Sequence, residues 1–159
     1  MNQKKSLRII ALEIFGPIVQ KMRYFKLRVK GYGNISSLAI IERGVNLDRV
    51  YPSSIFIGDG SLIASAVTIL CHEHVYRDPI DPNLPLHKAV HIGKRCFVGV
   101  ATVILPGVSI GDDCIIGAGS VVTKSIPSGS LAVGVPAKVI RSHLKLSSRA
   151  ILEQANMRA

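Results

Sequence analysis

An aliphatic residue recurs every six positions through the second half of this chain. The series comprises Ile92, Val98, Ile104, Ile110, Ile116 and Val122. Fainter copies precede it at Ile57, Ile63 and Ile69, and at Ile35, Ile41 and Leu47. A β-strand has a side-chain period of two and an α-helix a period of 3.6, so a strict period of six belongs to neither alone. It indicates a repeat architecture of short stacked units.

The hexads share more than their first residue. The second place is often Gly, and the fifth is small: Cys96, Thr102, Val108, Cys114 and Ser120. This pattern predicts one short strand and one corner per hexad, with three hexads closing a triangular coil. Residues eighteen apart then stack about 4.8 Å from each other, Ile92 under Ile110 and Ile104 under Val122. We expect the glycines to supply positive φ at the corners.

The composition agrees with thin, repetitive layers. Hydrophobic residues make up 48% of the 159 residues, aromatic residues only 5%, and Trp is absent. The three cysteines make no disulfide framework, and Cys96 and Cys114 are predicted to be reduced core thiols. No apolar run reaches about 18 residues and no secretory signal is evident, so we expect a cytoplasmic protein.

The N-terminal segment is strongly basic. Residues 1–30 hold eight Lys or Arg residues and one acidic residue, Glu13. Residues 7–28 carry a helical apolar stripe that Gly16-Pro17 should break. Residues 1–34 are therefore predicted to be a basic amphipathic helical cap on the repeat stack, with peripheral membrane contact through residues 1–30 at the inner face of the membrane. No motif for nucleic acid accompanies the charge, so no nucleic-acid partner is expected.

The repeat is interrupted between Ile69 and Ile92. Three prolines in this stretch predict an external loop over about residues 75–89, where function is often found. His72 and His74 stand at its edge, two residues apart, so on a strand they share a face while Glu73 points the other way. A histidine, with an ordinary pKa of about 6.5, can act as a general base at neutral pH.

These hexads, together with the terminal coil from Gly117 to Arg141, resemble the hexapeptide-repeat acyltransferases, in particular the maltose and galactoside O-acetyltransferases and the xenobiotic acetyltransferases. The resemblance implies a mainly β fold: a left-handed parallel β-helix over residues 35–141, with helical segments at both ends, the last at 142–159. It also implies a homotrimer with active sites between subunits.

The resemblance implies site residues too. It places the catalytic base seventeen residues after Ile57, at His74, with His72 assisting. Asp48 would bind a sugar hydroxyl or orient His74 from an adjacent subunit, and Glu73 is a further candidate on the acceptor side. Acetyl-CoA would be the co-substrate, with no metal. Its contacts would be Val100, Ala118, Thr123, Lys124, Lys138 and Arg141.

The predicted function is transfer of acetyl from acetyl-CoA to a hydroxyl of a sugar or polysaccharide precursor. Transfer to an amine, as on an amino-sugar nucleotide, is the alternative that the repeats do not separate. Two alternatives of other classes stay open: a zinc hydrolyase of the γ-carbonic-anhydrase type, which would use histidines such as His87 and His91, and a non-catalytic scaffold.

Overall fold

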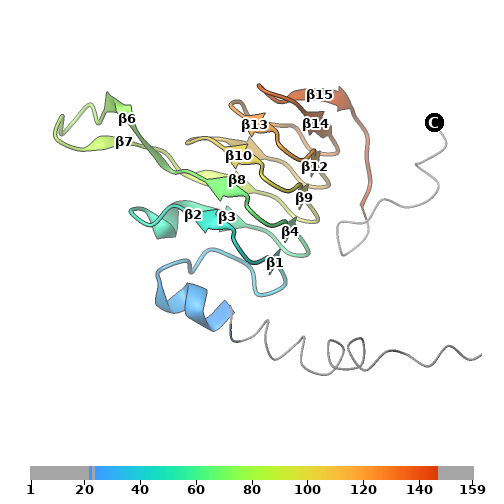
Figure 1. Cartoon of the computed structure of the whole chain (residues 1–159), viewed down its shortest axis with the longest axis horizontal. Coiled ribbons are helices and arrows are strands. Elements are labelled where there is room, and N and C mark those ends of the chain that lie inside the picture. The colour runs from blue at the N-terminus through green and yellow to red at the C-terminus, as the bar shows by residue number, and fades with distance from the viewer. Residues whose placement is uncertain (1–21, 23, 147–159) are drawn as a thin grey trace, which may run out of the picture.

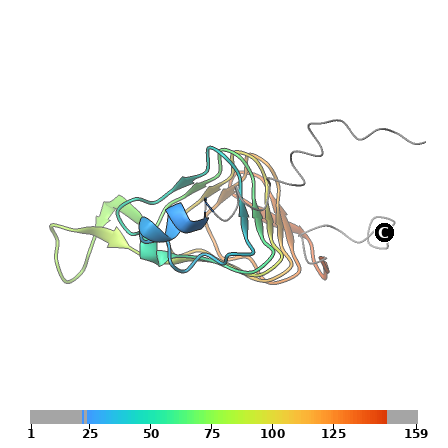
Figure 2. The same cartoon turned by 90° about the horizontal axis from the view of Figure 1, so that it is seen from below.

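The computed structural model describes residue 22 and residues 24–146. These residues form a mainly β structure in which very short strands stack as successive coils (Figure 1). Viewed along the stack, the coils superimpose as a triangle (Figure 2). Each side of the triangle is a sheet whose neighbouring strands come from successive coils.

Three sheets form the sides. The largest contains β1 (Ile40–Ile41), β4 (Leu62–Ile63), β9 (Phe97–Val98), β12 (Ile115–Ile116), β14 (Leu131–Val133) and β15 (Lys138–Arg141). The second contains β2 (Asn46–Leu47), β5 (Thr68–Ile69), β10 (Val103–Ile104) and β13 (Val121–Val122). The third contains β3 (Ile55–Ile57), β8 (Val90–Ile92) and β11 (Ser109–Ile110). All pairings in them are parallel except that of β15, which runs antiparallel on β14 and covers that edge.

The predicted stacking is confirmed. Ile92 pairs with Ile110, Val98 with Ile116 and Ile104 with Val122. The first residues of these six hexads are at most 3% exposed, and each buried aliphatic side chain contributes about 1.5–3 kcal/mol. Cys96 and Cys114 are buried free thiols in the same core, as expected.

The role expected of the second-place glycines is wrong. Positive φ occurs at the fourth place of the hexads instead, at Ala66, Arg95, Ala101, Gly107, Asp113 and Gly119. The second-place glycines are required instead by the close stacking of adjacent coils. A Cβ on Gly93 would lie 2.7 Å from the backbone of Gly111, and one on Gly99 would lie 2.6 Å from the backbone N of Ala118. Glycine is thus needed there because the adjacent coil leaves no room for a side chain.

The interruption of the repeat is not a structureless loop. Strands β6 (His72–Arg77) and β7 (Pro85–His87) pair antiparallel and project from the coil as a hairpin (Figure 2). Pro85 is tolerated at the start of β7 because this two-stranded sheet consists only of edges. A one-turn 3₁₀ helix, η1 (Pro52–Ser54), fills the smaller break after β2.

The ends of the described chain differ from each other. Residues 24–29 are helical and lie at the β1 end of the stack (Figure 1), where Leu27 packs against the core. At the other end, residues 142–146 are not helical: His143 has a positive φ of 64°, and Leu144, which is buried, donates a backbone hydrogen bond to the carbonyl of Gly129. Residues 1–21 and 147–159 of the two predicted helical segments lie outside the described residues.

Candidate active site

A buried carboxylate lies at the end of β2. The side chain of Asp48 is 0% exposed, and its Oδ2 lies 2.5 Å from Nδ1 of His72, the first residue of β6. The same oxygen accepts a hydrogen bond from the backbone N–H of Cys71 at 2.7 Å. Oδ1 accepts from the N–H groups of Val50 and Tyr51. Both oxygens are therefore satisfied from within the chain.

These bonds decide the charge of Asp48. Burial by itself opposes ionisation, but the hydrogen bonds from Cys71, Tyr51, His72 and Val50 outweigh it and hold the pKa of Asp48 below its ordinary value. An ionised Asp48 takes the Nδ1 proton of His72 as its hydrogen-bond donor. The lone pair of the neutral imidazole then resides on Nε2, the geometry of a histidine prepared to accept a proton.

Four rings form a continuous row beside this pair. The ring of His74 meets that of His72 edge-on, with centroids 5.1 Å apart. On the other side Tyr51 is tilted against His72 at 5.6 Å and stacks on His87 at 4.0 Å. His87 Nε2 lies 2.7 Å from Oγ of Ser54 in η1. The row joins the base of the hairpin to the break after β2.

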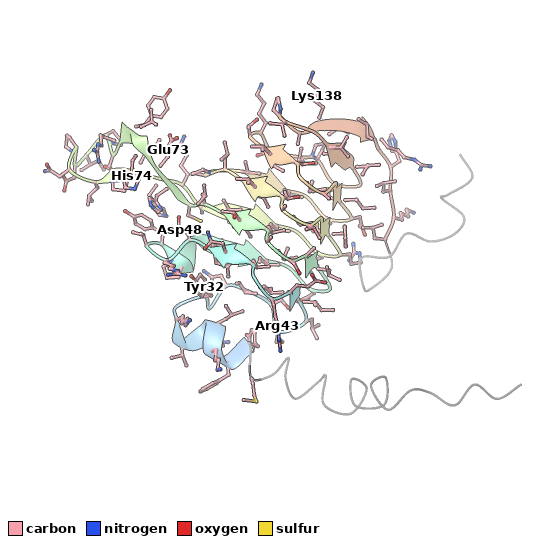
Figure 3. All side chains as sticks on the ribbon, viewed as in Figure 1. Tyr32, Arg43, Asp48, Glu73, His74 and Lys138 are labelled. Carbon is pink, nitrogen blue, oxygen red and sulfur yellow. The ribbon has the colours of Figure 1, made fainter. Side chains whose placement is uncertain are left out.

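Side chains alternate along β6, so Glu73 lies on the opposite side of the strand from the row of rings. Glu73 and His74 project to opposite sides of the strand (Figure 3), which agrees with the predicted shared face of His72 and His74. His74 is exposed, and it makes no side-chain hydrogen bond to any other residue of the described part of the chain. Glu73 is half-buried and pairs across the hairpin with Leu86.

The structure gives Asp48 a partner that sequence reasoning did not name. The expectation is that Asp48 binds a sugar hydroxyl or orients His74 from an adjacent subunit. In the structure the carboxylate has no exposed surface, and it is bonded to His72 of the same chain. The physical reason is the break after β2, which folds the residues after Asp48 back so that their N–H groups enclose it.

Cys71 adjoins the pair but is not a nucleophile candidate. It is 0% exposed, and burial raises the pKa of its thiol to about 11. Its carbonyl accepts a hydrogen bond from the N–H of Lys88, which ties the chain to the coil directly after β7, at the base of the hairpin. The thiolate is the reactive form of cysteine, so Cys71 is inert at neutral pH.

The residues expected to contact coenzyme fall into two groups. Val100 and Ala118 stack at one corner, where the N–H of Gly119 donates to the carbonyl of Val100. Both are exposed, Val100 to 49%. The two coils lie in close contact at this corner, because Gly99 has no side chain to hold them apart.

The second group lies at the other end of β13. Thr123 and Lys124 follow that strand directly and are exposed. Lys138 begins β15, and its neighbour Ala137 donates a hydrogen bond to the carbonyl of Val121 in β13. Arg141 ends β15, opposite Leu131, and is half-buried. Lys138 lies near the β15 end of the stack, far from Asp48, which follows β2 (Figure 3).

One sheet edge connects the two regions. Asp48 follows β2, His72 is the third residue after β5, and Thr123 and Lys124 follow β13. Because these strands are parallel and paired in the order β2, β5, β10, β13, their C-terminal ends share an edge. His72 and Lys124 therefore lie along one edge of the sheet. The strands that they follow, β5 and β13, are two strand spacings of about 4.8 Å apart.

Sequence reasoning did not place Tyr51 or Ser54 in the site, and it named His87 only as a candidate zinc ligand. A signal for their position exists, because Asn46-Leu47 pairs with Thr68-Ile69 one coil away. That register brings the break at 48–54 beside the residues that open the hairpin. The contacts of the Tyr51 and Ser54 side chains depend on how the chain turns within residues 48–54, and the six-residue period does not predict that turn.

A family model for the hexapeptide repeat of succinyl-transferase matches residues 89–124. A curated relative, "Nodulation protein L" of Rhizobium meliloti (strain 1021), is 44% identical over 114 residues, which cover 68% of this chain. The solved maltose O-acetyltransferase of Clostridium difficile 630 is 31% identical with a TM-score of 0.54, and the match covers 67% of each chain. The chain belongs to the hexapeptide-repeat acyltransferases. A galactoside acetyltransferase solved in complex with coenzyme A matches this chain too, with 27% identity and a TM-score of 0.54 over 80% of this chain and 82% of that one.

The match to the curated relatives is partial in length. The chain spans 60% of the Rhizobium meliloti protein and about half of two others that it matches. Residues 22 and 24–146 contain no helix that is long and apolar enough to cross a membrane. The same residues hold no group of three or more His, Cys, Asp or Glu side chains placed to bind a metal ion.

Proposed function

We propose that the protein is an acetyl-CoA-dependent O-acetyltransferase that acts on a hydroxyl of a sugar or polysaccharide precursor. The observation that carries the proposal is the Asp48–His72 pair, a buried ionised carboxylate bonded to Nδ1 of a histidine at the edge of the break in the repeat. The family places acyl transfer on this scaffold, and the solved relatives named for maltose and galactoside act on sugar hydroxyls.

The pair supplies a general base. Asp48 fixes the ring of His72 and the proton on Nδ1, so Nε2 is free to take the proton of an acceptor hydroxyl. Acetyl-CoA would supply the activated acetyl thioester that the deprotonated oxygen attacks. The proton held on Nε2 then serves the departing thiolate, and the charge of Asp48 stabilises the imidazolium in between.

His74 is the alternative base. The motif resemblance selects it by its distance from Ile57, whereas the hydrogen-bond geometry favours His72, because His74 has no carboxylate to orient it among the described residues. We propose His72 as the base and His74 as a neighbour that lines the acceptor side with Glu73. Comparing variants of the two histidines decides between them.

The donor site is proposed to run across β10 and β13, from the corner that precedes these strands to the edge at their C-terminal ends. Val100 and Ala118 at the corner would border the pantetheine arm, and Thr123 at the edge would follow it. Lys124, Lys138 and Arg141 would meet the phosphates, because coenzyme A is polyanionic and cationic side chains bind phosphate. Lys124 and Lys138 fit this role, since both are exposed near one end of the stack.

We also propose the left-handed β-helix over residues 35–141, the terminal segments 1–34 and 142–159 as separate units, and a homotrimer with sites between subunits. Support for the trimer comes from the outer face of the largest sheet. Its outward residues are apolar in five successive strands: Ile40, Leu62, Phe97, Ile115 and Leu131. Such a continuous apolar ladder favours burial against another subunit. A cytoplasmic location agrees with three buried free thiols.

The proposal is tested by incubating the full chain with acetyl-CoA and a panel of sugars and amino sugars, following the release of free thiol. Hydroxyl acceptors should be acetylated, and amino sugars should gain acetyl on oxygen, as mass spectrometry would show. Acetylation on nitrogen alone would favour the amine alternative. No turnover with any acceptor and no binding of acetyl-CoA would leave only a scaffold role.

A further inference from the structure

The helix at the β1 end of the stack turns an apolar stripe away from the protein. Met22, Phe25 and Val29 are 57%, 69% and 72% exposed. Their spacing of three and four places them on one helical face. The opposite face holds Leu27, which packs against the core. Leu27 thus packs the helix onto the core, while the more hydrophobic side of the helix has no partner among the described residues.

Cations flank this stripe. Lys26 and Lys30 follow one side of it and are exposed. On the other side Arg28 donates a hydrogen bond to the hydroxyl of Tyr24 at 3.1 Å and lies over its ring. Arg43 of the first coil is exposed and lies at the same end of the molecule (Figure 3). No acidic residue occurs in the sequence between Glu13 and Glu42.

We propose that this end face, defined by Met22, Phe25, Lys26, Val29 and Lys30, docks on an anionic phospholipid bilayer. An amphipathic helix with large apolar side chains and flanking lysines lies in a membrane interface, where the apolar stripe enters the acyl boundary and the cations meet lipid phosphates. The complementarity of charge selects this occupant. A nucleic acid would pair with the cations but leave the apolar stripe unburied.

The position of the face matters as much as its chemistry. It lies at one end of the stack, beyond β1, whereas the hairpin with His74 projects sideways (Figure 1, Figure 3). Docking on this end would leave the hairpin uncovered, because it projects from the side of the stack, away from the helix (Figure 1). Resting on the proposed transferase function, this placement suits an acceptor saccharide that is attached to a lipid.

The test is flotation of the full chain with vesicles, which needs no turnover and is independent of the proposed activity. We expect the protein to float with vesicles containing phosphatidylglycerol but not with pure phosphatidylcholine, and added salt should release it. Phe25→Glu with Val29→Glu should lower the bound fraction about tenfold or more. Ile80→Glu, at a 93% exposed apolar residue of the hairpin tip, is the matched control and should leave binding unchanged.

Three results would overturn the proposal. The first is no flotation, and the second is equal binding to neutral and anionic vesicles. The third is a change of oligomeric mass in the Phe25→Glu, Val29→Glu variant, which would place the stripe between copies of the chain. Acetylation of a water-soluble sugar should be the same in this variant and the wild type, so loss of docking and loss of activity are distinguished.

Discussion

Asp48 is the residue on which the site depends, because its buried side chain bonds both a candidate base and three backbone N–H groups. Sequence reasoning found Asp48, His72 and His74 as candidates, since each lies where the repeat breaks. It could not assign the pairing. Which histidine meets the carboxylate depends on how the chain turns after β2 and before β6, and the hexad period does not specify turns.

Replacing Asp48 by Asn should impair catalysis by acting through His72. The amide keeps the size of the side chain but stabilises neither the Nδ1–H tautomer nor the imidazolium, so we expect kcat to fall about 10²–10⁴-fold. A pH–rate profile is the deciding readout. If the profile and kcat were those of the wild type, Asp48 would have only a structural role.

The same residue should make stability depend on pH. Its folded-state pKa lies below the ordinary 3.8, so Asp48 stabilises the fold above that value, and this contribution is lost as the pH falls through the lower folded-state pKa. Urea denaturation of the wild type and Asp48→Asn should differ most near neutral pH and converge in strong acid. A difference that grew toward acid pH would contradict the assigned direction.

The cysteines should be unreactive until the protein unfolds. All three are buried free thiols. Burial raises the pKa of Cys71 to about 11, whereas the hydrogen bond from Cys96 lowers the pKa of Cys114 to about 7, so it is exclusion of the reagent by burial that protects Cys114. Titration with a thiol reagent at neutral pH should detect almost none in the native protein and three after denaturation. Rapid labelling of Cys71 in the native state would show that the base of the hairpin opens.

At the scale of the strand, the hexad predicted the stacking partners but not the reason for its glycines. The period follows from which residues point inward, and the sequence displays that directly. The separation between coils is a property of the backbone in three dimensions. Gly93 and Gly99 therefore looked like corner residues, whereas the fourth place carries the positive φ.

Gly93→Ala should destabilise the coil stack. The new Cβ would meet the backbone of Gly111 at 2.7 Å, and overpacking of this kind costs about 1–3 kcal/mol. Gly33→Ala is the matched control, since nothing lies within 4 Å of its Cβ position. Thermal melts of both variants measure the effect, and equal melting temperatures would mean that the coils separate easily.

The hairpin shows the limit of prediction at this scale. Its prolines correctly indicated a segment outside the coil, yet β6 and β7 pair as strands. Proline excludes a central strand but not a strand at an edge. The stacking of Tyr51 on His87 and the contact of His87 with Ser54 then fix the base of the hairpin beside the dyad.

For the whole molecule, the apolar ladder on the largest sheet is the feature that the repeat alone did not reveal. Phe97→Lys would place a charge in the middle of this ladder, opposite Leu62 and Ile115. We expect the proposed trimer to dissociate to monomers, as sedimentation velocity would show. Lys94→Ala, at an exposed residue of the same coil, serves as control. A wild-type protein that is already monomeric would refute the trimer.

We propose above all that acetyl transfer by this protein requires His72, the base of the Asp48–His72 pair. The direct measurement is thiol release from acetyl-CoA in the presence of an identified sugar acceptor, compared among the wild type, His72→Gln and His74→Gln. We predict that His72→Gln lowers kcat about 10²–10⁴-fold, with a smaller loss in His74→Gln. Wild-type turnover in His72→Gln, together with its loss in His74→Gln, would contradict the assignment and return the role of base to His74.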